Sequence, residues 1–569
     1  MLVLYLLIGR YYPTVDITGV CTMLSSRLVS LFLAGALLLA GCAHDQKVPT
    51  SAKLKSVEFT VVHTNDNHGK FWRNRHGEMG MAARKTLIDR IRRDVESKGG
   101  KVLVLSAGDV NTGVPESDIQ QAKPDFIGMN MIGYDAMALG NHEFDNPLPV
   151  LLEQEHWAHF PFLAANIFYK NNHELLFKPY IMKDLEGVRV AILGLTTEDT
   201  EALVMQDNVK DIYFTDAVST AKEWVPKLKD KEKADVVIAL THIGHYLNAV
   251  HGNNAPGDVT LAKDVNGIDI IVGGHSQNKM EKPDIKNSTY ILQAWEWGKY
   301  VGRADFVYYY VDNFDGKGNR GGVLKMVNYR LIPVNLKKQV LVNGKSEWVS
   351  IEPEIPENPE VLKVLQVYQD KASKMLLRTV GELDKPMPGE RDIVRSRPAA
   401  IGVLIARAQM EKAKADLGVV NGGGIRTGLP AGNITEKDVL SVQPFGNMVC
   451  YVEMTGTELK HFIEDIASIE PTNGGFAHFS NNVRLTISGG DKLTRLEING
   501  KPVQKDKTYR LAINEFSASG GDKWPEIDNN PTFINTGYTD AVVLKDYIQK
   551  HSPLQRIVFE PQPGDIIRK

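Results

Sequence analysis

Five short apolar runs in the first half of the 569-residue chain each end in a polar turn whose side chains are able to bind a metal ion. The runs are VEFTVVHTNDNH, KVLVLSAGD, YDAMALGNHEFD, DVVIALTHIGH and IDIIVGGHSQ. The possible donors in these turns are Asp66, His68, Asp109, Asn141, His142, Asp145, His242, His275 and Gln277. Because α/β sheets bind ligands beyond the carboxyl ends of their strands, five such turns can converge on one crevice. The pattern therefore favours a hydrolase with two metal ions.

The residue types in these turns suit a pair of divalent cations, which needs a bridging carboxylate and oxygen or nitrogen donors on each side. Asp109 follows a strongly hydrophobic run and a glycine, so it is the natural bridge. Asp66 and His68 are one residue apart, and a non-helical turn can direct both at one ion. The set contains no thiolate. These residues therefore fit a mixed nitrogen and oxygen site for Mg, Mn, Co or Zn better than they fit a structural zinc site. A single donor of this kind is more often an ordinary turn residue. A shared metal site, however, explains all five turns at once.

Arginines and loop phenylalanines in the second half indicate recognition of an anionic, aromatic ligand. GVVNGGGIRTG places three glycines before Arg426, which lets the backbone approach an anion beside a guanidinium. Arg391 and Arg395 are four residues apart and share a face if their segment is helical. Phe445 and Phe516 lie in loops with Gly and Ser neighbours, where two rings can stack on a nucleobase. Taken alone, the glycine-rich turn favours a structural role, and a single Phe favours core packing.

The elements that must position these residues follow from the hydrophobic pattern. From Val57 onward, strand-length apolar runs alternate with amphipathic stretches such as MAARKTLIDRIRRDVES and AVSTAKEWVPKLKD, which predicts an α/β layered domain over residues 57–352. EPEIPENPE then leads into the helical pattern VLKVLQVYQDKASKMLLRTV, so residues 353–380 are expected to form a linker and hinge helix. Residues 381–569 are expected to form a second α/β domain with strands LGVVN, VCYVEM, VRLTI and TYRLAIN. The active site is expected between the two domains.

The composition is that of a globular protein, with 43% hydrophobic and 24% charged residues. A chain of 569 residues exceeds one ordinary core, which agrees with two or three domains. The formal net charge of -3 argues against a nucleic acid polymer as partner, since such partners usually demand a basic face. A small anion held by a few arginines is compatible with that charge. The sequence indicates no obligate protein partner.

The N-terminus has the pattern of a secretory signal. From Met23 it reads MLSSRLVSLFLAGALLLAGC, in which Arg27 precedes a short apolar stretch and small residues precede Cys42. The ending LAGC resembles a bacterial lipobox, which implies a lipidated (palmitate-bearing) Cys42 as the mature N-terminus and an anchor without a spanning helix. Ala43 favours the outer membrane of the cell envelope. A plain signal peptide with an incidental cysteine is the alternative.

This interpretation divides the start of the chain into an upstream extension (1–22), a lipoprotein signal peptide (23–41) and a tether (42–56). Of three cysteines, Cys21 and Cys42 lie in this region, so Cys450 is the one remaining thiol of the mature chain. It therefore has no partner for an intramolecular disulfide, and its strand-like surroundings, NMVCYVEM, predict a buried and inert side chain.

The motifs HTNDNHG, GDVNTG, GNHEFD, THIGH and GGHSQ resemble the metal motifs of the calcineurin-like metallophosphatases. More narrowly, nearly all the mature chain resembles the bacterial 5′-nucleotidase/UDP-sugar hydrolase family, whose animal relatives are ecto-5′-nucleotidases. The resemblance implies an α/β fold with an N-terminal calcineurin-like β-sandwich flanked by helices, a linker helix and a second α/β substrate-binding domain. It also implies two divalent metal ions as cofactors.

The resemblance assigns roles to the individual residues. The first metal takes Asp66, His68, Asp109 and Gln277. The second takes Asp109, Asn141, His242 and His275, and His142 with Asp145 resembles the family's catalytic dyad. In that dyad, His142 stabilises charge on the phosphoryl group or leaving oxygen while Asp145 orients its imidazole. His63 and His245 match no family ligand, and we expect both to be structural or supporting.

The motifs PFGN and F-x-A-x-GGD resemble the family's nucleotide-specificity motifs. They imply stacking on the base by Phe445 and Phe516, a base contact by Asn447 and a ribose hydroxyl contact by Asp522. The three arginines, Arg391, Arg395 and Arg426, would hold the phosphate. The chain departs from the pattern with Lys523-Trp524 after GGD, where many relatives have Gly and an aromatic residue, which leaves the base preference open.

The sequence therefore predicts an exported, lipid-anchored, metal-dependent phosphoric monoester hydrolase. It would act as a 5′-nucleotidase on external AMP, ATP and similar nucleotides by in-line attack of a metal-bound hydroxide, for nucleotide scavenging. A UDP-sugar hydrolase or a 2′,3′-cyclic phosphodiesterase/3′-nucleotidase would use the same chemistry on another ester. A nucleotide-binding lipoprotein is the alternative from a different class, and it would need neither a binuclear ligand set nor His142.

Overall fold

The computed structural model describes residues 53–568, apart from 248–255, 313, 315–319, 343–344, 489–491, 563 and 565. The predicted signal peptide, Cys42 and most of the predicted tether lie outside the described residues. The chain divides into a large compact unit of residues 57–308 and 324–569 and a small one that includes residues 309–323. Within the small unit, Asp312 pairs with Lys55 and Arg320 at 2.6 and 2.9 Å. Among the described helices, none is long and apolar enough to cross a membrane.

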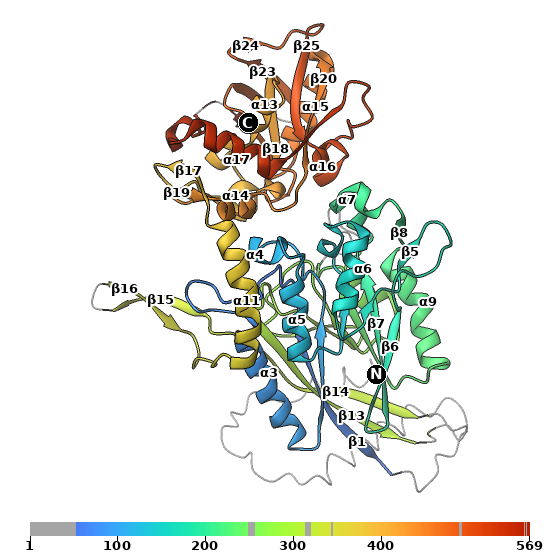
Figure 1. Ribbon diagram of the computed structural model, residues 1–569. Helices are drawn as coiled ribbons and strands as arrows, with labels where there is room; N and C mark the ends of the chain where they lie inside the picture. The colour runs from blue at the N-terminus through green and yellow to red at the C-terminus, as the bar shows by residue number, and fades with distance from the viewer. Residues whose placement is uncertain are drawn as a thin grey trace, which may run out of the picture. The chain divides into compact units, whose positions relative to one another are not determined.

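The first half contains a six-stranded sheet that carries three of the five predicted turns (Figure 1). Its strand order is β14 (Gly321–Pro333), β13 (Tyr300–Val311), β1 (Lys55–Thr64), β2 (Lys101–Ser106), β3 (Ala136–Ala138) and β4 (Phe162–Leu163). Strands β1 to β4 run parallel, so their carboxyl ends meet at one edge. Asp66, Asp109 and Asn141 follow β1, β2 and β3 and are brought to that edge.

A second six-stranded sheet carries the other two turns. Its order is β11 (Asp284–Lys286), β12 (Thr289–Leu292), β10 (Ile270–Val272), β9 (Val236–His242), β7 (Val188–Thr196) and β6 (Tyr180–Leu185). Strands β7, β9, β10 and β12 are parallel, and β6 is antiparallel to β7. Gly194 of β7 lies against β4, where a Cβ would come within 2.4 Å of the Leu163 backbone, so the two sheets pack closely there.

Helices cover the outer faces of the two sheets through buried apolar side chains, as the amphipathic patterns predict. Helices α3 (Met81–Glu96) and α5 (Lys123–Ile132) contribute Ile88 and Phe126 to a core shared with Val62 of β1. Helix α9 (Ala217–Asp230) contributes Val225 and Leu228 to the core of the second sheet. This arrangement is the predicted α/β layered fold.

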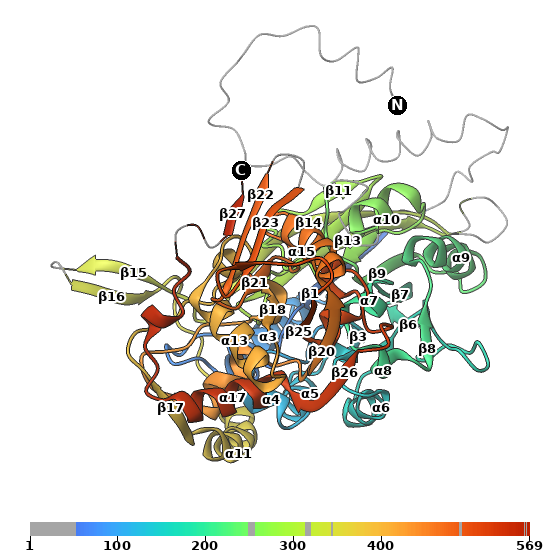
Figure 2. The same cartoon turned by 90° about the horizontal axis from the view of Figure 1, so that it is seen from above.

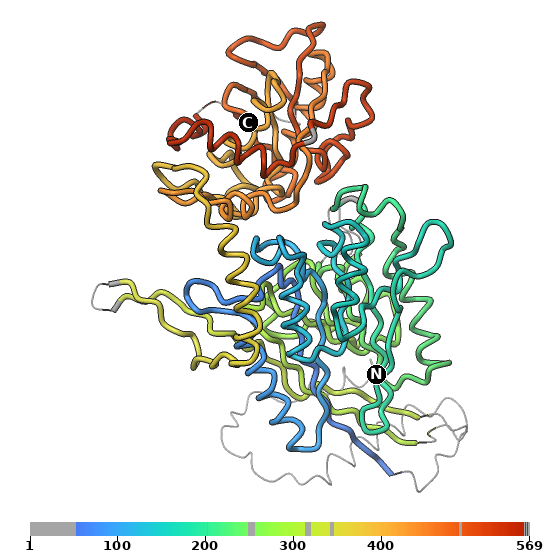
Figure 3. Tube along the Cα trace, in the orientation of Figure 1, coloured from blue at the N-terminus to red at the C-terminus, as the bar shows by residue number. Residues whose placement is uncertain are grey.

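A single helix, α11 (Pro359–Leu376), occupies the predicted linker, and Figure 3 follows the chain through it. Asn358 caps it by accepting the N–H groups of Glu360 and Val361 at 3.0 and 3.1 Å. The predicted helical stretch ran to Val380, which is wrong at its end. Thr379 instead begins β17 (Thr379–Leu383), because this β-branched pair enters an antiparallel ladder with β19 (Gly432–Thr435).

The second half contains a five-stranded sheet and a four-stranded sheet (Figure 2). All four predicted strands are present, as β18 (Leu417–Asn421), β20 (Met448–Thr455), β22 (Val483–Ser488) and β25 (Thr508–Asn514). Helices α13 (Ala400–Lys412) and α17 (Asp540–His551) pack into one core, while α15 (Gly456–Ser468) packs into a second. Cys450 lies fully buried in β20, and burial raises the pKa of its thiol to about 12, in agreement with an inert side chain.

Candidate active site

The predicted metal ligands share an unusual backbone conformation. Five of them have a positive φ: Asp66 (51°), His68 (48°), Asp109 (53°), His275 (74°) and Gln277 (52°). Residues with a side chain seldom adopt this left-handed region, and such strain gathers at functional sites. Backbone hydrogen bonds fix the first two turns against each other, from Asp66 N–H to Gly108 O at 2.9 Å and from His68 N–H to Asp109 O at 3.0 Å. The ligands are thus held in place by their turns.

A buried carboxylate that sequence reasoning missed holds the Asp109 turn. Glu143 is fully buried and accepts the backbone N–H groups of Asp109, Val110, Asn111 and Gly140 at 2.7 to 3.2 Å. The Asp109 side chain also packs against Gly140, where a Cβ would lie 2.1 Å from Asp109 Oδ1, so this position requires a glycine. The available signal was a glutamate inside the apolar surroundings of GNHEFD, where a charge needs partners.

Two histidines are oriented as metal ligation requires. His68 Nδ1–H donates to Thr112 O at 2.7 Å, and His242 Nδ1–H donates to Ala107 O at 2.5 Å. Each Nε2 therefore faces the cluster, 3.8 and 3.0 Å from Asp109 Oδ2, and Asp109 raises the pKa of His242 to about 10 against the effect of burial. Metal-binding histidines usually bond their second nitrogen to a carbonyl or carboxylate in this way.

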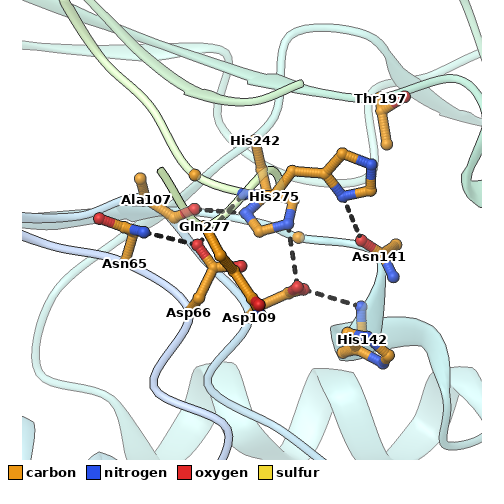
Figure 4. Close-up of polar contacts among 12 residues, drawn as sticks. Asn65, Asp66, Ala107, Asp109, Asn141, His142, Thr197, His242, His275 and Gln277 are labelled. Carbon is orange, nitrogen blue, oxygen red and sulfur yellow. Dashed lines mark hydrogen bonds and ion pairs between the residues drawn. The ribbon is translucent and has the colours of Figure 1, made fainter. Parts of the chain in front are cut away.

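The remaining predicted ligands complete a cluster around Asp109 (Figure 4). His275 Nδ1 lies 2.9 Å from Asn141 Oδ1, and the Gln277 amide nitrogen lies 3.0 Å from His68 Nε2. Asp66 Oδ1 is buried without a hydrogen-bond partner among the described residues, and His68 Nε2 is 3.9 Å from it. An orphaned carboxylate oxygen among imidazoles and amides fits a divalent cation, so the residues present suit the two metal ions that the resemblance implies.

The charges in this cluster are strongly coupled. Burial raises the pKa of Asp66 to about 7, against the effect of His242. Burial also opposes the charge on Asp109, yet His242, His142 and His68 hold the pKa of that carboxyl well below its usual range. Burial lowers the pKa of His68 to about 3, which keeps the imidazole neutral and available as a ligand. The site is therefore organised around one carboxylate that is shared by several imidazoles.

His142 and Asp145 form a hydrogen-bonded pair beside Asp109. His142 Nδ1 lies 2.6 Å from Asp145 Oδ2, and the His142 backbone N–H donates to Asp109 Oδ1 at 2.9 Å. Burial lowers the pKa of His142, but Asp145 and Asp109 outweigh burial, and the net shift is upward. The pair can thus present a protonated or hydrogen-bond-donating imidazole to an anion at the metal cluster.

Three guanidiniums gather without counter-ions. Arg391 begins the one-turn helix α12 (Arg391–Val394) and Arg395 is the residue after its end, so the segment is helical only as far as Val394. In the part of the chain that the structure describes, no ion pair joins these two or Arg426 to a carboxylate. Burial and the proximity of Arg391 and Arg426 lower the pKa of Arg395 to about 9. Unpaired cations that repel one another form a ready site for an anion.

The predicted nucleoside-binding residues surround these arginines. The Phe445 ring stacks on the His142 ring with centroids 5.8 Å apart, and the Arg426 guanidinium lies 5.4 Å from the Phe445 centroid. At 2.8 Å, the Asn447 backbone carbonyl accepts the N–H of the buried Asp540, a residue that sequence reasoning missed. Asn421 Nδ2 donates to Asp522 Oδ2 at 2.7 Å.

One cavity of about 990 Å³ unites the two sets. From the first half it is lined by Asp109, Asn141, His142, Asp145, His275 and Gln277, and from the second by Arg391, Arg395, Arg426, Phe445, Asn447, Phe516 and Asp522. The other three predicted ligands, Asp66, His68 and His242, are buried, with at most 2% exposure.

Two further histidines lie outside the cluster, as expected. His63 is fully buried, with no hydrogen-bond partner in the described chain, and its ring stacks on Tyr329. His245 Nε2 lies 3.1 Å from Asp284 Oδ2, and the His245 backbone N–H donates to Ser276 Oγ at 2.8 Å. His245 thereby supports the turn that carries His275 and Gln277.

Comparison with known proteins agrees with this geometry. The family model of calcineurin-like phosphoesterases matches residues 59–278, and that of the 5′-nucleotidase C-terminal domain matches residues 379–528. The chain is 47% identical to a 5′-nucleotidase of Vibrio cholerae over 93% of this chain and 96% of the relative. It is 49% identical to Protein UshA of Escherichia coli over 89% of this chain and 94% of the relative.

Solved structures show the same fold. A 5′-nucleotidase precursor from Thermus thermophilus is 27% identical, with a TM-score of 0.68 over 90% of this chain and 99% of that chain. Both halves of the sequence resemblance are thereby confirmed, as are the fold and the class of enzyme. The chain belongs to the bacterial 5′-nucleotidase/UDP-sugar hydrolase family and is a metal-dependent phosphoester hydrolase that acts on nucleotides.

Proposed function

We propose that the protein is an exported, lipid-anchored 5′-nucleotidase that releases nucleoside and phosphate from external nucleoside 5′-phosphates such as AMP. The single observation that carries the 5′-nucleotidase assignment is the shared cavity, because it joins a candidate cation-binding cluster to three unpaired arginines and to Phe445 and Phe516. A phosphate, a ribose and a base presented together satisfy all three groups. The 5′-nucleotidases of Vibrio cholerae and Thermus thermophilus support the same substrate class.

The chain's own residues divide the work of hydrolysis. Asp66, His68, Asp109 and Gln277 would hold the first cation, while Asp109, Asn141, His242 and His275 would hold the second. When bound, two cations supply Lewis-acid polarisation of the phosphate and an activated water for in-line attack.

The second half and the dyad complete the reaction. The three arginines orient the phosphate and offset its charge. His142 donates a hydrogen bond to the phosphoryl group or the departing 5′ oxygen, and Asp145 accepts from His142 Nδ1–H and holds the ring in that orientation. Phe445 and Phe516 stack on the base, Asn447 contacts its edge and Asp522 accepts a ribose hydroxyl.

Phosphate release by metal-depleted protein tests this function. Mg²⁺, Mn²⁺, Co²⁺ or Zn²⁺ should each be added separately with AMP, ATP, UDP-glucose, 3′-AMP or 2′,3′-cyclic AMP. We expect a cation to restore turnover of AMP, with AMP cleaved far faster than 3′-AMP. Faster cleavage of 3′-AMP or of UDP-glucose would assign the protein to another branch of the family. Tight nucleotide binding without turnover in metal-replete protein would instead identify a binding lipoprotein.

Anchoring rests on the lipobox-like LAGC ending at Cys42, which lies outside the described residues. Lipidation of Cys42 would tether the catalytic part to the outer membrane through residues 43–56. Replacing Cys42 by Ser should move activity from the outer-membrane fraction to the soluble fraction and abolish incorporation of a palmitate analogue. Unchanged fractionation of the variant would refute the anchor.

A further inference from the structure

The loop after Phe516 places a lysine where the backbone suits a glycine. Gly520, Asp522 and Lys523 have φ values of 90°, 54° and 73°. Glycine adopts this region freely, whereas a residue with a Cβ does so at a conformational cost, and such costs gather at functional sites. Lys523 is therefore held in a conformation that its own side chain disfavours.

The carboxylate before this lysine is fixed on three sides. Asp522 accepts a hydrogen bond from Asn421 Nδ2 at 2.7 Å. Gly423 and Gly474 lie against the same carboxylate, because a Cβ on either would come within 2.3 and 2.7 Å of its oxygens. Asp522 thus has a single orientation in the cavity wall.

The residue after the lysine is equally fixed. Trp524 is 3% exposed, and its Nε1–H donates to Gly475 O at 2.8 Å. With both neighbours anchored, the backbone of Lys523 has little freedom to relax out of the left-handed region. Its side chain is exposed and lines the same cavity as the arginines.

The ammonium group of Lys523 has no counter-ion: across the described residues, no carboxylate lies within ion-pair distance of it. The cavity therefore holds a fourth unpaired cation besides Arg391, Arg395 and Arg426. Lys523 comes from a different loop than the three arginines and directly follows Asp522. An unpaired ammonium in a substrate cavity suits a further anionic group of the substrate.

We propose that Lys523 forms a subsite for a second phosphate, esterified to the ribose 2′ or 3′ hydroxyl, so that nucleoside 3′,5′- and 2′,5′-bisphosphates are favoured substrates. This inference rests on the proposed function, because it takes the position of the ribose from Asp522. The phosphate chain of ADP or ATP offers the same chemistry from the 5′ side, but it extends from the phosphate that the arginines hold. Asp522 accepts the ribose hydroxyl that stays free, and because Lys523 directly follows Asp522 in the chain, we assign the second phosphate to the other ribose hydroxyl.

The test compares kcat/KM for adenosine 3′,5′-bisphosphate, adenosine 2′,5′-bisphosphate, ADP and AMP in the metal-loaded full chain. In Lys523→Met the ratio of a ribose bisphosphate to AMP should fall about tenfold, the effect of losing one charge-assisted hydrogen bond. Lys523→Arg should retain most of the ratio. Lys505→Met removes an exposed lysine of the same half outside the cavity and should leave the ratio unchanged.

An unchanged ratio in Lys523→Met overturns the proposal, as does a fall confined to ADP or an equal fall in Lys505→Met. Lys523→Gly removes the same charge and is the variant whose backbone best fits a φ of 73°, so it serves if Lys523→Met folds poorly. Failure of the proposed function is distinguishable, because wild-type protein would then cleave 3′-AMP or UDP-glucose faster than AMP, or release no phosphate from AMP with any cation.

Discussion

The two walls of the cavity suit ligands of opposite charge. The metal wall is the cluster of predicted metal ligands around Asp109, and the recognition wall is the set of arginines and phenylalanines around Arg395. Around Asp109 the chain buries carboxylates, imidazoles and amides, and one buried carboxylate oxygen, Asp66 Oδ1, lacks a hydrogen-bond partner in the described chain. Around Arg395 it gathers guanidiniums that form no ion pair with a carboxylate among the described residues, and Asp522 offsets their mutual repulsion only in part. Each wall by itself carries an electrostatic cost that a ligand of the opposite sign removes. Cations bound at the metal wall, and a phosphate bound between these cations and the arginines, would remove the electrostatic cost of both walls.

The walls also differ in how their residues are fixed. Five metal-cluster residues are locked by left-handed turns, and Glu143 binds the backbone of one of them. On the other wall, Phe445 and Phe516 are partly exposed, and Arg391 is exposed. Under the proposed function, rigid turns hold the groups that would bind the cations, while the part proposed to bind the nucleoside keeps accessible side chains for stacking and ion pairing.

Loss of the shared carboxylate should have the largest effect. Asp109→Asn removes the charge around which both cation sites are arranged, so we expect kcat/KM for AMP to fall by at least about 1000-fold. Metal content, measured by mass spectrometry after dialysis, should fall in parallel. Asp230→Asn, an exposed aspartate on α9, is the matched control. Near-normal turnover in Asp109→Asn would show that the cluster around Asp109 does not hold the cations that the reaction needs.

Loss of the dyad should leave the cations in place. His142→Gln should lower kcat by about 100- to 1000-fold because the donor to the phosphoryl group or leaving oxygen is removed. Asp145→Asn should lower kcat less, since the imidazole remains but loses its carboxylate partner. Metal content should be unchanged in both, which separates them from Asp109→Asn. His159→Gln, at an exposed position, should match wild type.

Loss of one arginine should affect binding and stability in opposite directions. Arg395→Gln should raise KM for AMP about 10-fold or more, because one charged contact to the phosphate is lost. In substrate-free protein the same change should raise Tm by about 2 °C, since it removes a partly buried cation that Arg391 and Arg426 repel. Arg397→Gln, two residues away and exposed, should do neither. A lower Tm for Arg395→Gln would show that the arginines are not strained when unliganded.

More of the metal wall than of the recognition wall could be predicted from the sequence. Asp66, His68, Asp109 and the later ligands lie in turns at strand ends, and the parallel sheets bring those ends together. The burial of a glutamate in GNHEFD gave a signal that Glu143 needs partners, but neither its partners nor the contact of Asp540 with the Asn447 backbone was predictable, because no local pattern marks a pairing with a distant residue. The end of α11 was misplaced because the ladder that ends it pairs residues 379–383 with residues 432–435.

The smallest effect concerns Asp540, a residue of the second half with a buried carboxyl and a backbone N–H that donates to Asn447 O. Burial raises its pKa to about 7, above the value of about 4 for an unfolded aspartate. The folded protein therefore binds this proton more tightly, and the resulting stability is complete below about pH 4 and is lost as pH rises through 7.

Asp540→Asn carries no such proton, so its unfolding free energy should lose about 2 to 3 kcal/mol less than that of wild type between pH 5 and pH 8. Urea unfolding of both proteins in chelator measures this difference, and the other buried carboxyls, Asp118 and Asp125, cancel because both proteins contain them. Parallel pH profiles of the two proteins would mean that Asp540 is already ionised at pH 5. The second half would then contain a buried anion next to Asn447 of the cavity wall. The difference in charge between the two walls would be smaller than the arginines alone indicate.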